Sequence, residues 1–405
     1  MPITYEQWHQ RIDATLNWRK SYWNGTDAWM RYDALYNGDH WRSSTFSRNN
    51  YGLDIDSENP RDRITVMKTM NTILTIKPFL IKRRPKFILR ARRQDSPTDV
   101  VSAFLQQEQL NYDWKELKMQ KQARLAILDG LVIGHGIVKT GYISDFPTAA
   151  SRKDGDIEYR EYIREDSTYL ERINPLHFLF DVEGSQNGDI ETGRWAGQVF
   201  FRSREDVVAD SDYSSKVRSQ IKSGFDQPEY ISSVIYKSEE DEDAARRCIL
   251  YEIWDKKYRK YYIFCRGINP PLMEEEWPYD YLEGFPYVKF DYIPIRNAPF
   301  GVGIPYTIED QQLEKNRVRT TMFEHRRRFN RKYVAIEGSI DPTEKDKFET
   351  GTDGTIVWAK DHQAIVPIQD ANLTSDNYRL DQIIDRDFDD VTGLDALVRN
   401  APLPS

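Results

Sequence analysis

Cysteine is almost absent from the chain, and so are the features that would place a protein in a membrane or outside a cell. Its 405 residues include two cysteines, Cys248 and Cys265, too few for a disulfide framework or a four-cysteine zinc site. No apolar run approaches the ~18 residues that a membrane span needs, and the N-terminal MPITYEQWHQR does not resemble a signal peptide. We therefore expect a protein made and kept in a cytoplasm, with no membrane partner.

The motifs that carry catalysis are also missing. The six histidines show no paired or HExxH spacing, and the Gly-His-Gly at 134–136 lacks the lysine of a phosphate-binding loop. The acidic run from Asp385 to Asp390 lacks the glycine and the glutamate of a calcium loop. We expect no enzyme and no cofactor. A metal-dependent nuclease that uses this acidic run is one alternative, and a DNA-binding scaffold is another.

Charge is unevenly distributed along the chain, although the net charge is -8. Residues 61–93 are rich in lysine and arginine and contain Asp62 as their sole acid. The centre of this stretch is a basic patch of four residues: Lys82, Arg83, Arg84 and Lys86. Two interpretations stay open, because clustered cations can contact the phosphates of DNA or pair with an acidic surface on a neighbouring subunit.

Hydrophobic periodicity predicts an α+β fold. Helices are expected at 5–23, at 26–38, after the Ser96-Pro97 start signal and at 115–133, whereas 157–300 reads as short strands. The clearest hairpin should place Trp254 opposite Arg259 and Cys248 opposite Cys265. Aromatic residues make up 13% of the chain, and such residues favour interfaces, so we expect an oligomer.

A long helix at 305–330 has very little to bury. Pro305 is compatible with its first turn, Thr307 can cap it, and its apolar residues form a thin, interrupted seam. A small α/β segment follows, and then a helix at 374–392 that carries apolar residues on one face and aspartates on another.

Several stretches, in their order along the chain, resemble the portal or head-to-tail connector family of tailed bacteriophages. The N-terminal ones are WMRYDALYNGDHW and ITVMKTMNTILTIKPFLIKRRPKFILRARR, and the middle ones are ILDGLVIGHGIVKTGY and RINPLHFLFDVEG. The C-terminal ones are PFGVGIPYTIEDQQLEKNRVRTTMFEHRRRFN and DDVTGLDALVRN.

This resemblance implies a portal-like, ring-forming architecture. It assigns a helical and β-rich wing to 1–304, a first stem helix to 305–330, a clip to 331–373 and a second stem helix to 374–392. Residues 393–405 would begin a tunnel-loop region, and the crown expected after them is either truncated or naturally absent.

The resemblance also implies a function without catalysis. Usually twelve subunits form a ring at a unique capsid vertex of the virion, assembled in the host bacterial cytoplasm. Double-stranded DNA passes through the ring during packaging and ejection. The expected partners are the terminase large subunit, a head-tail adaptor, and capsid and scaffolding proteins.

Specific residues follow from the resemblance as hypotheses. Twelve helices spaced about 8–10 Å apart would leave a bore of about 25 Å, wide enough for a duplex. Three acids could line that bore, although a solvated outer face is the alternative: Asp381, Asp385 and Asp389. Three arginines could pair with acids of the next subunit: Arg317, Arg319 and Arg326. Four clip residues could dock the terminase or adaptor: Asp341, Glu344, Lys347 and Phe348.

Overall fold

The computed structural model separates the chain into two compact units. One unit contains 1–37 and 69–307, and the other contains 38–68 and 308–405. The structure describes residues 3–41, 63–81, 84–145, 148–153, 156–161, 165–185, 188–221, 247–277, 283–329, 333–336, 338, 340–350, 358, 365–367 and 375–393.

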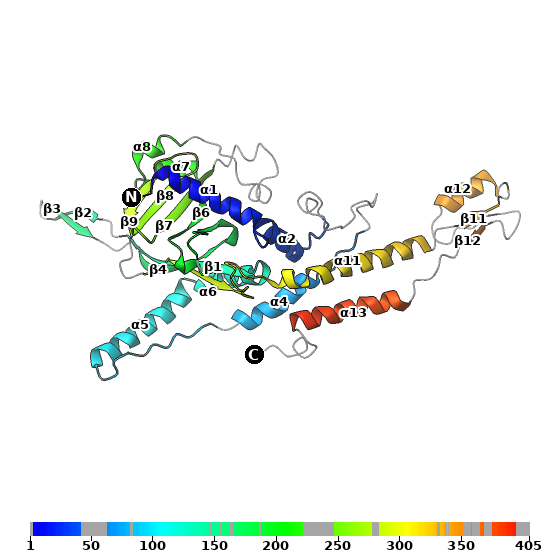
Figure 1. Cartoon of the computed structure of the whole chain (residues 1–405), viewed down its shortest axis with the longest axis horizontal. Helices are drawn as coiled ribbons and strands as arrows, with labels where there is room; N and C mark the ends of the chain where they lie inside the picture. The colour runs from blue at the N-terminus through cyan, green and yellow to red at the C-terminus, as the bar shows by residue number, and fades with distance from the viewer. Residues whose placement is uncertain are drawn as a thin grey trace. The chain divides into compact units, whose positions relative to one another are not determined.

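The first unit mixes helices and antiparallel strands (Figure 1). Its main helices are α1 (Tyr5–Ser21), α2 (Thr26–Asn37), α5 (Pro97–Glu116), α6 (Met119–Val132), α7 (Arg204–Ala209) and α8 (Ser215–Arg218). Helix α4 (Lys68–Ile81) begins at the last residue of the other unit and continues into this one. Its strands are β1 (His135–Asp145), β2 (Thr148–Lys153), β3 (Asp156–Glu161), β4 (Glu165–Ile173), β5 (Phe178–Phe180), β6 (Trp195–Ser203), β7 (Arg247–Asp255), β8 (Lys260–Cys265), β9 (Met273–Glu276) and β10 (Tyr287–Asp291). Short 3-10 helices, η2 (Pro175–His177) and η3 (Ile190–Thr192), connect them. The predicted α+β fold is confirmed.

A five-stranded antiparallel sheet, in the order β5-β6-β7-β8-β9, forms the centre of this unit. Helix α1 begins with a capping box between Thr4 and Gln7, which satisfies backbone groups that a helix start leaves unpaired. Its Trp8 and Ile12, one turn apart, are buried against the sheet together with Trp195 and Phe264. Figure 1 shows α1 crossing this face of the sheet. The helix predicted at 5–23 is therefore present, and its apolar face packs on the sheet.

The predicted register of the β7–β8 hairpin is wrong by two residues. Trp254 lies opposite Tyr261 rather than Arg259, and Cys265 lies opposite Leu250 rather than Cys248. The cause is the turn, in which Asp255 accepts hydrogen bonds from the amides of residues 257 and 258. Arg259 then adopts a left-handed conformation with φ +49°, which places the turn one residue further along. A shift of two preserves the faces of the strands, so both cysteines are still buried on the same side.

A three-stranded sheet, β10-β1-β4, borders a cluster of buried rings. His135, at the start of β1, stacks on Phe300 at 4.5 Å and meets Trp29 edge-on at 4.8 Å. Neither ring nitrogen of His135 has a hydrogen-bond partner in the described part of the chain. Burial, followed by the charges of Lys289 and Arg19, holds the pKa of His135 well below its usual value. The imidazole is therefore neutral and packs as an aromatic ring.

The second unit contains the long helix that the sequence predicted. Helix α11 extends over Ile304–Phe329, so Pro305 lies in its first turn as expected. Thr307, predicted as a cap, lies inside the helix instead, and its hydroxyl donates to the carbonyl of Ile304. After α11 come β11 (Tyr333–Ala335), α12 (Pro342–Thr350), β12 (Ile365–Pro367) and α13 (Ser375–Thr392), with β11 and β12 paired antiparallel. The division into wing, stem and clip stays a prediction. None of the described helices is both long and apolar enough to cross a membrane.

Candidate functional site

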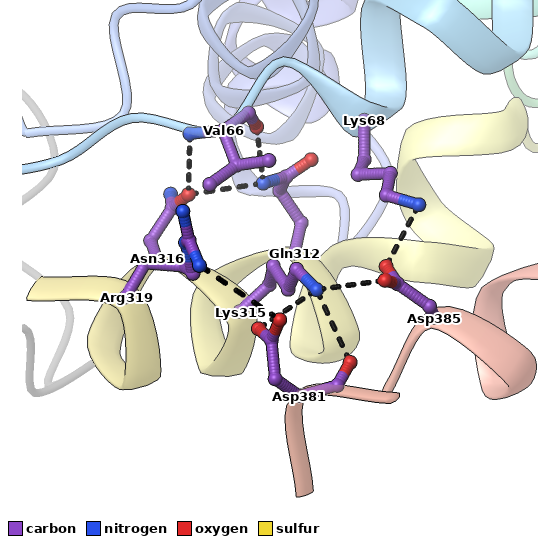
Figure 2. Close-up of polar contacts among 8 residues, drawn as sticks. All are labelled: Val66, Lys68, Gln312, Lys315, Asn316, Arg319, Asp381 and Asp385. Carbon is purple, nitrogen blue, oxygen red and sulfur yellow. Dashed lines mark hydrogen bonds and ion pairs between the residues drawn. The ribbon is translucent and has the colours of Figure 1, made fainter. Parts of the chain in front are cut away.

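The polar face of α11 binds an extended segment of the chain, residues 64–66. The amide of Ile64 donates to Thr320 Oγ1 at 3.1 Å, and the amide of Val66 donates to Asn316 Oδ1 at 2.9 Å. Gln312 Nε2 donates to the carbonyl of Val66 at 2.7 Å (Figure 2). Two residues of extended chain cover about 6.6 Å along the chain, and four residues of a helix cover about 6 Å along its axis. These two repeat distances are nearly equal. Side chains four apart on a helix can therefore bond every second residue of the segment.

The two amide side chains of α11 that make these bonds are buried, which explains why the helix has so few apolar residues. Gln312 and Asn316 are almost fully inaccessible, and Asn316 Nδ2 also lies 2.7 Å from His40 Nδ1. Buried polar groups are tolerated when they are hydrogen-bonded, and these amides are. In an ordinary core helix these positions would carry leucine. Here they carry side-chain amides, which make the hydrogen bonds to the extended segment that the backbone of a neighbouring strand would otherwise make.

A second face of α11 binds α13 through one lysine. Lys315 Nζ lies 2.8 Å from Asp381 Oδ1 and 3.0 Å from Asp385 Oδ2, and it donates to the carbonyl of Asp381 at 3.1 Å. The Lys315 side chain is 5% exposed. Lys68 Nζ, from the start of α4, completes the cluster at 2.7 Å from Asp385 Oδ1 (Figure 2). Two ammonium groups thus face two carboxylates.

Apolar contacts and electrostatics support this cluster. Ile384 and Phe388 of α13 are buried, and Lys68 Nζ lies 5.8 Å from the centre of the Phe388 ring. Burial by itself raises the pKa of Asp385, but its hydrogen bonds and ion pairs with Lys68 and Lys315 outweigh it and bring the pKa below its usual value. Asp385 is therefore ionised at neutral pH.

The acids predicted to line a bore are placed differently from one another. Asp381 and Asp385 belong to the Lys315 cluster, and Asp389, two turns after Asp381, is half-buried. Their place in a bore stays a prediction.

The three arginines predicted to contact a neighbouring subunit also differ from one another in their surroundings. Arg319 Nη1 approaches Asp381 Oδ2 of its own chain at 4.0 Å, and the Arg326 guanidinium lies 5.9 Å from the Phe323 ring. Arg317 and Arg326 are exposed. Pairing of these arginines with a neighbouring subunit stays a prediction, and Arg319 has a weak partner within its own chain.

The predicted docking residues all lie on or beside helix α12. Lys347 Nζ pairs with Glu344 Oε1 at 2.6 Å, and the amide of Trp358 donates to Glu344 Oε2 at 3.0 Å. The carbonyl of Asp341 accepts from the amide of Glu344 at the helix start. Phe348 is exposed, as is Trp358. Glu344 therefore organises this segment, and its role in docking stays a prediction.

The structure describes part of the predicted basic patch. Lys82 and Arg83 lie outside the described residues, whereas Arg84 and Lys86 are exposed in the extended segment that precedes α5 in the chain. Asn111 of α5 accepts from the amide of Phe87 at 3.0 Å and donates to its carbonyl at 3.1 Å. Gln107 accepts from the amide of Leu89 at 3.2 Å. The arrangement is the same as on α11: side chains four residues apart on the helix bond backbone groups two residues apart in the extended segment. We call residues 84–92 together with α5 the arm.

Sequence reasoning missed both of these arrangements. The available signal was an amide repeated at four-residue spacing within a helix, as in Gln107 and Asn111 or Gln312 and Asn316. Its partner segment, however, is far away in sequence for α11 and has no motif of its own. Among the described residues, no three histidine, cysteine or acidic side chains gather as metal ligands would.

Comparison with known proteins decides the family. Residues 95–398 match the family model described as Phage SU10 portal protein. The chain belongs to this family. The match begins at the start of the arm helix and continues through α11 and α13, so it includes the paired helices described above. The prediction of a phage portal protein is confirmed, and the portal family is structural rather than enzymatic. No curated protein matches the chain.

Proposed function

We propose that the chain is the repeating subunit of a ring at a unique capsid vertex, through which double-stranded DNA enters and leaves the phage head. The observation that carries the proposal is the portal-family match, which spans α5 to α13. The helix pair supports it, because Lys315 fixes α11 and α13 side by side and so gives each subunit a long, stiff element for a ring wall.

The further assignments rest on the same comparison. Helices α11 and α13 would be the stem, and the segment between them the clip, which docks the terminase large subunit and the head-tail adaptor through Asp341, Glu344, Lys347 and Phe348. The subunit would also contact capsid and scaffolding proteins. The polar faces of the stem favour passage of DNA without sequence-specific contacts, since no base-reading motif is present.

The nuclease alternative gains no support from the geometry. Lys315 and Lys68 occupy the positions beside Asp385 that a divalent cation would take. A carboxylate already neutralised by two ammonium groups is a poor ligand for a metal ion.

Mass measurement in solution tests the proposed function. Native mass spectrometry and negative-stain images of the purified full chain should show closed rings of about twelve subunits, or a monomer that closes into rings on concentration. A chain that stays monomeric at every concentration, or that cuts DNA with magnesium and loses this activity in Asp387→Ala, would contradict the proposal.

A further inference from the structure

The outer surface of the arm is apolar at several positions that face solvent. Ile88 is 70% exposed and Phe104 58%, and three more exposed side chains of α5 continue the surface: Val101, Leu105 and Tyr112. An exposed helix of 20 residues that buries almost none of its apolar side chains is unusual for a monomer. This surface needs a partner.

Unpaired cations surround the apolar surface. Four exposed residues of the segment have no acidic partner within the described residues: Arg84, Lys86, Arg90 and Arg92. The nearby Arg93 approaches Asp99 at 3.5 Å, and both are substantially exposed. The partner should therefore be acidic.

One backbone edge of the segment is also free. Backbone groups of successive residues in an extended chain point to opposite edges, and α5 binds the edge of residues 87 and 89. The groups of residues 86, 88 and 90, on the other edge, make no hydrogen bond within the described part of the chain. A free edge of this kind accepts another strand.

The same combination argues against DNA as the partner. Phosphate contacts use cations and polar groups, and they leave apolar side chains such as Phe104 and Leu105 exposed. A surface that interleaves cations, large apolar residues and a free strand edge fits the edge of a protein sheet better.

The chain itself has a surface with the complementary features. Strand β9 is an edge of the five-stranded sheet and, within the described residues, pairs with β8 alone. Its Glu275 and Glu276 are exposed, whereas Glu274 is held by Lys260 and by Tyr5. An acidic free edge and a basic free edge therefore occur in the same subunit.

We propose that the arm of one subunit docks on the β9 edge of the next, with residues 84–92 adding a strand to the neighbour's sheet. Each copy offers one basic and one acidic edge, which is the head-to-tail arrangement that closes a ring. The proposal rests on the ring of the proposed function, and it adds which surfaces meet and which charges hold them.

A charge exchange tests this contact in the full-length chain. Arg90→Glu with Arg92→Glu, or Glu275→Arg with Glu276→Arg, should raise the concentration for half-assembly about tenfold, as expected for two weak ion pairs lost. The four changes together should restore assembly to the wild-type concentration. The matched control is Lys121→Glu with Lys216→Glu, which alters two exposed cations of the same unit and should leave assembly unchanged. Mass photometry measures the assembled fraction, and circular dichroism verifies folding.

A direct contact should also be trapped chemically. Ile88→Cys with Glu275→Cys should give a ladder of disulfide-linked oligomers on oxidation, whereas either change alone should not, because the two native cysteines are buried. The proposal is overturned if the arm variant assembles as the wild type does, or if the exchange fails to restore assembly. It is also overturned if the arm variant assembles normally but binds duplex DNA more weakly. Failure of the wild-type chain to form rings would instead defeat the proposed function first.

Discussion

At the scale of the residue, a few buried polar side chains decide how the chain folds. Lys315 connects two helices, Asn316 connects a helix to an extended segment, and Lys139 connects two sheets through a buried ion pair with Glu252 at 2.6 Å. His135 differs from these three, since both of its ring nitrogens are buried without a hydrogen-bond partner in the described structure. Removing one member of such a group leaves another polar atom buried, which costs more than the bond itself contributes.

Lys315→Met should therefore destabilise the second unit. The change removes the positive charge that pairs with the carboxylates of Asp381 and Asp385. We expect the free energy of unfolding to fall by about 2 kcal/mol. That is less than for a fully buried pair, because the Asp385 side chain is 40% exposed. Urea unfolding followed by fluorescence measures the loss. Arg319→Met, whose ion pair is long and half exposed, is the control and should cost less than about 0.5 kcal/mol. Equal losses in the two variants would contradict the role of Lys315.

His135 should make stability depend on pH. Its folded-state pKa is lowered by burial, so the unfolded chain binds an additional proton once the pH falls below about 6.5. The stability present above this pH should decrease by up to about 1.4 kcal/mol per pH unit on acidification. His135→Phe keeps the ring stack and should reduce that slope between pH 6.5 and 5, measured by urea unfolding at several pH values. An unchanged slope would show that other groups cause it.

At the scale of the element, the helices were more predictable than their partners. Hydrophobic spacing predicted the bounds of α1, the Ser96-Pro97 signal predicted the start of α5, and the compatibility of Pro305 with a first turn agreed with the start of α11, each to within a few residues, since these signals are local. The hairpin register was missed because it depends on which residue starts the turn, and Asp255 gave no clear sign of it. The partner of α11, residues 64–66, could not be predicted because the contact joins positions about 250 apart in sequence.

Asn316→Leu tests whether amides rather than apolar packing hold this segment. The change removes the acceptor of the Val66 amide and should cost about 2 kcal/mol of stability, because that half-buried amide then loses its hydrogen-bond partner. Hydrogen exchange at Val66 should become much faster. Glu314→Ala, an exposed position on the same helix, is the control and should leave exchange unchanged. Slow exchange at Val66 in the Asn316 variant would show that other contacts protect the segment.

At the scale of the whole molecule, the family match and the paired helices favour a ring whose wall is made of charged, weakly apolar helices. The order of the motifs along the chain sufficed to predict the family. The order of the motifs did not predict which face of α11 or α13 would meet DNA in the proposed ring, because that depends on neighbouring subunits.

Asp389→Lys tests the proposed lining with little disturbance of the Lys315 cluster. Rings should still form, since Lys315, Asp381 and Asp385 are unchanged, but a cation facing the bore would attract phosphates and slow the passage of DNA. An in-vitro packaging assay with capsids carrying the variant should show less DNA protected from nuclease. Gln382→Lys, at an exposed position on α13, is the control. Normal packaging in both variants would place Asp389 away from the DNA.

The hydrogen-bonding groups of α11 and of its bound segment recur at nearly the same distance along the chain. This match also limits where residues can be inserted or deleted. A one-residue insertion between Ile64 and Val66 would point the backbone amide that now bonds Thr320 to the opposite edge of the segment. A one-residue insertion in α11 between Gln312 and Asn316 would rotate Asn316 to a different face of the helix. Insertions and deletions should therefore be tolerated only when they occur together, with two residues changed in the extended segment for every four residues changed in the helix. Helix α11 would then lengthen or shorten only in steps of about one helical turn.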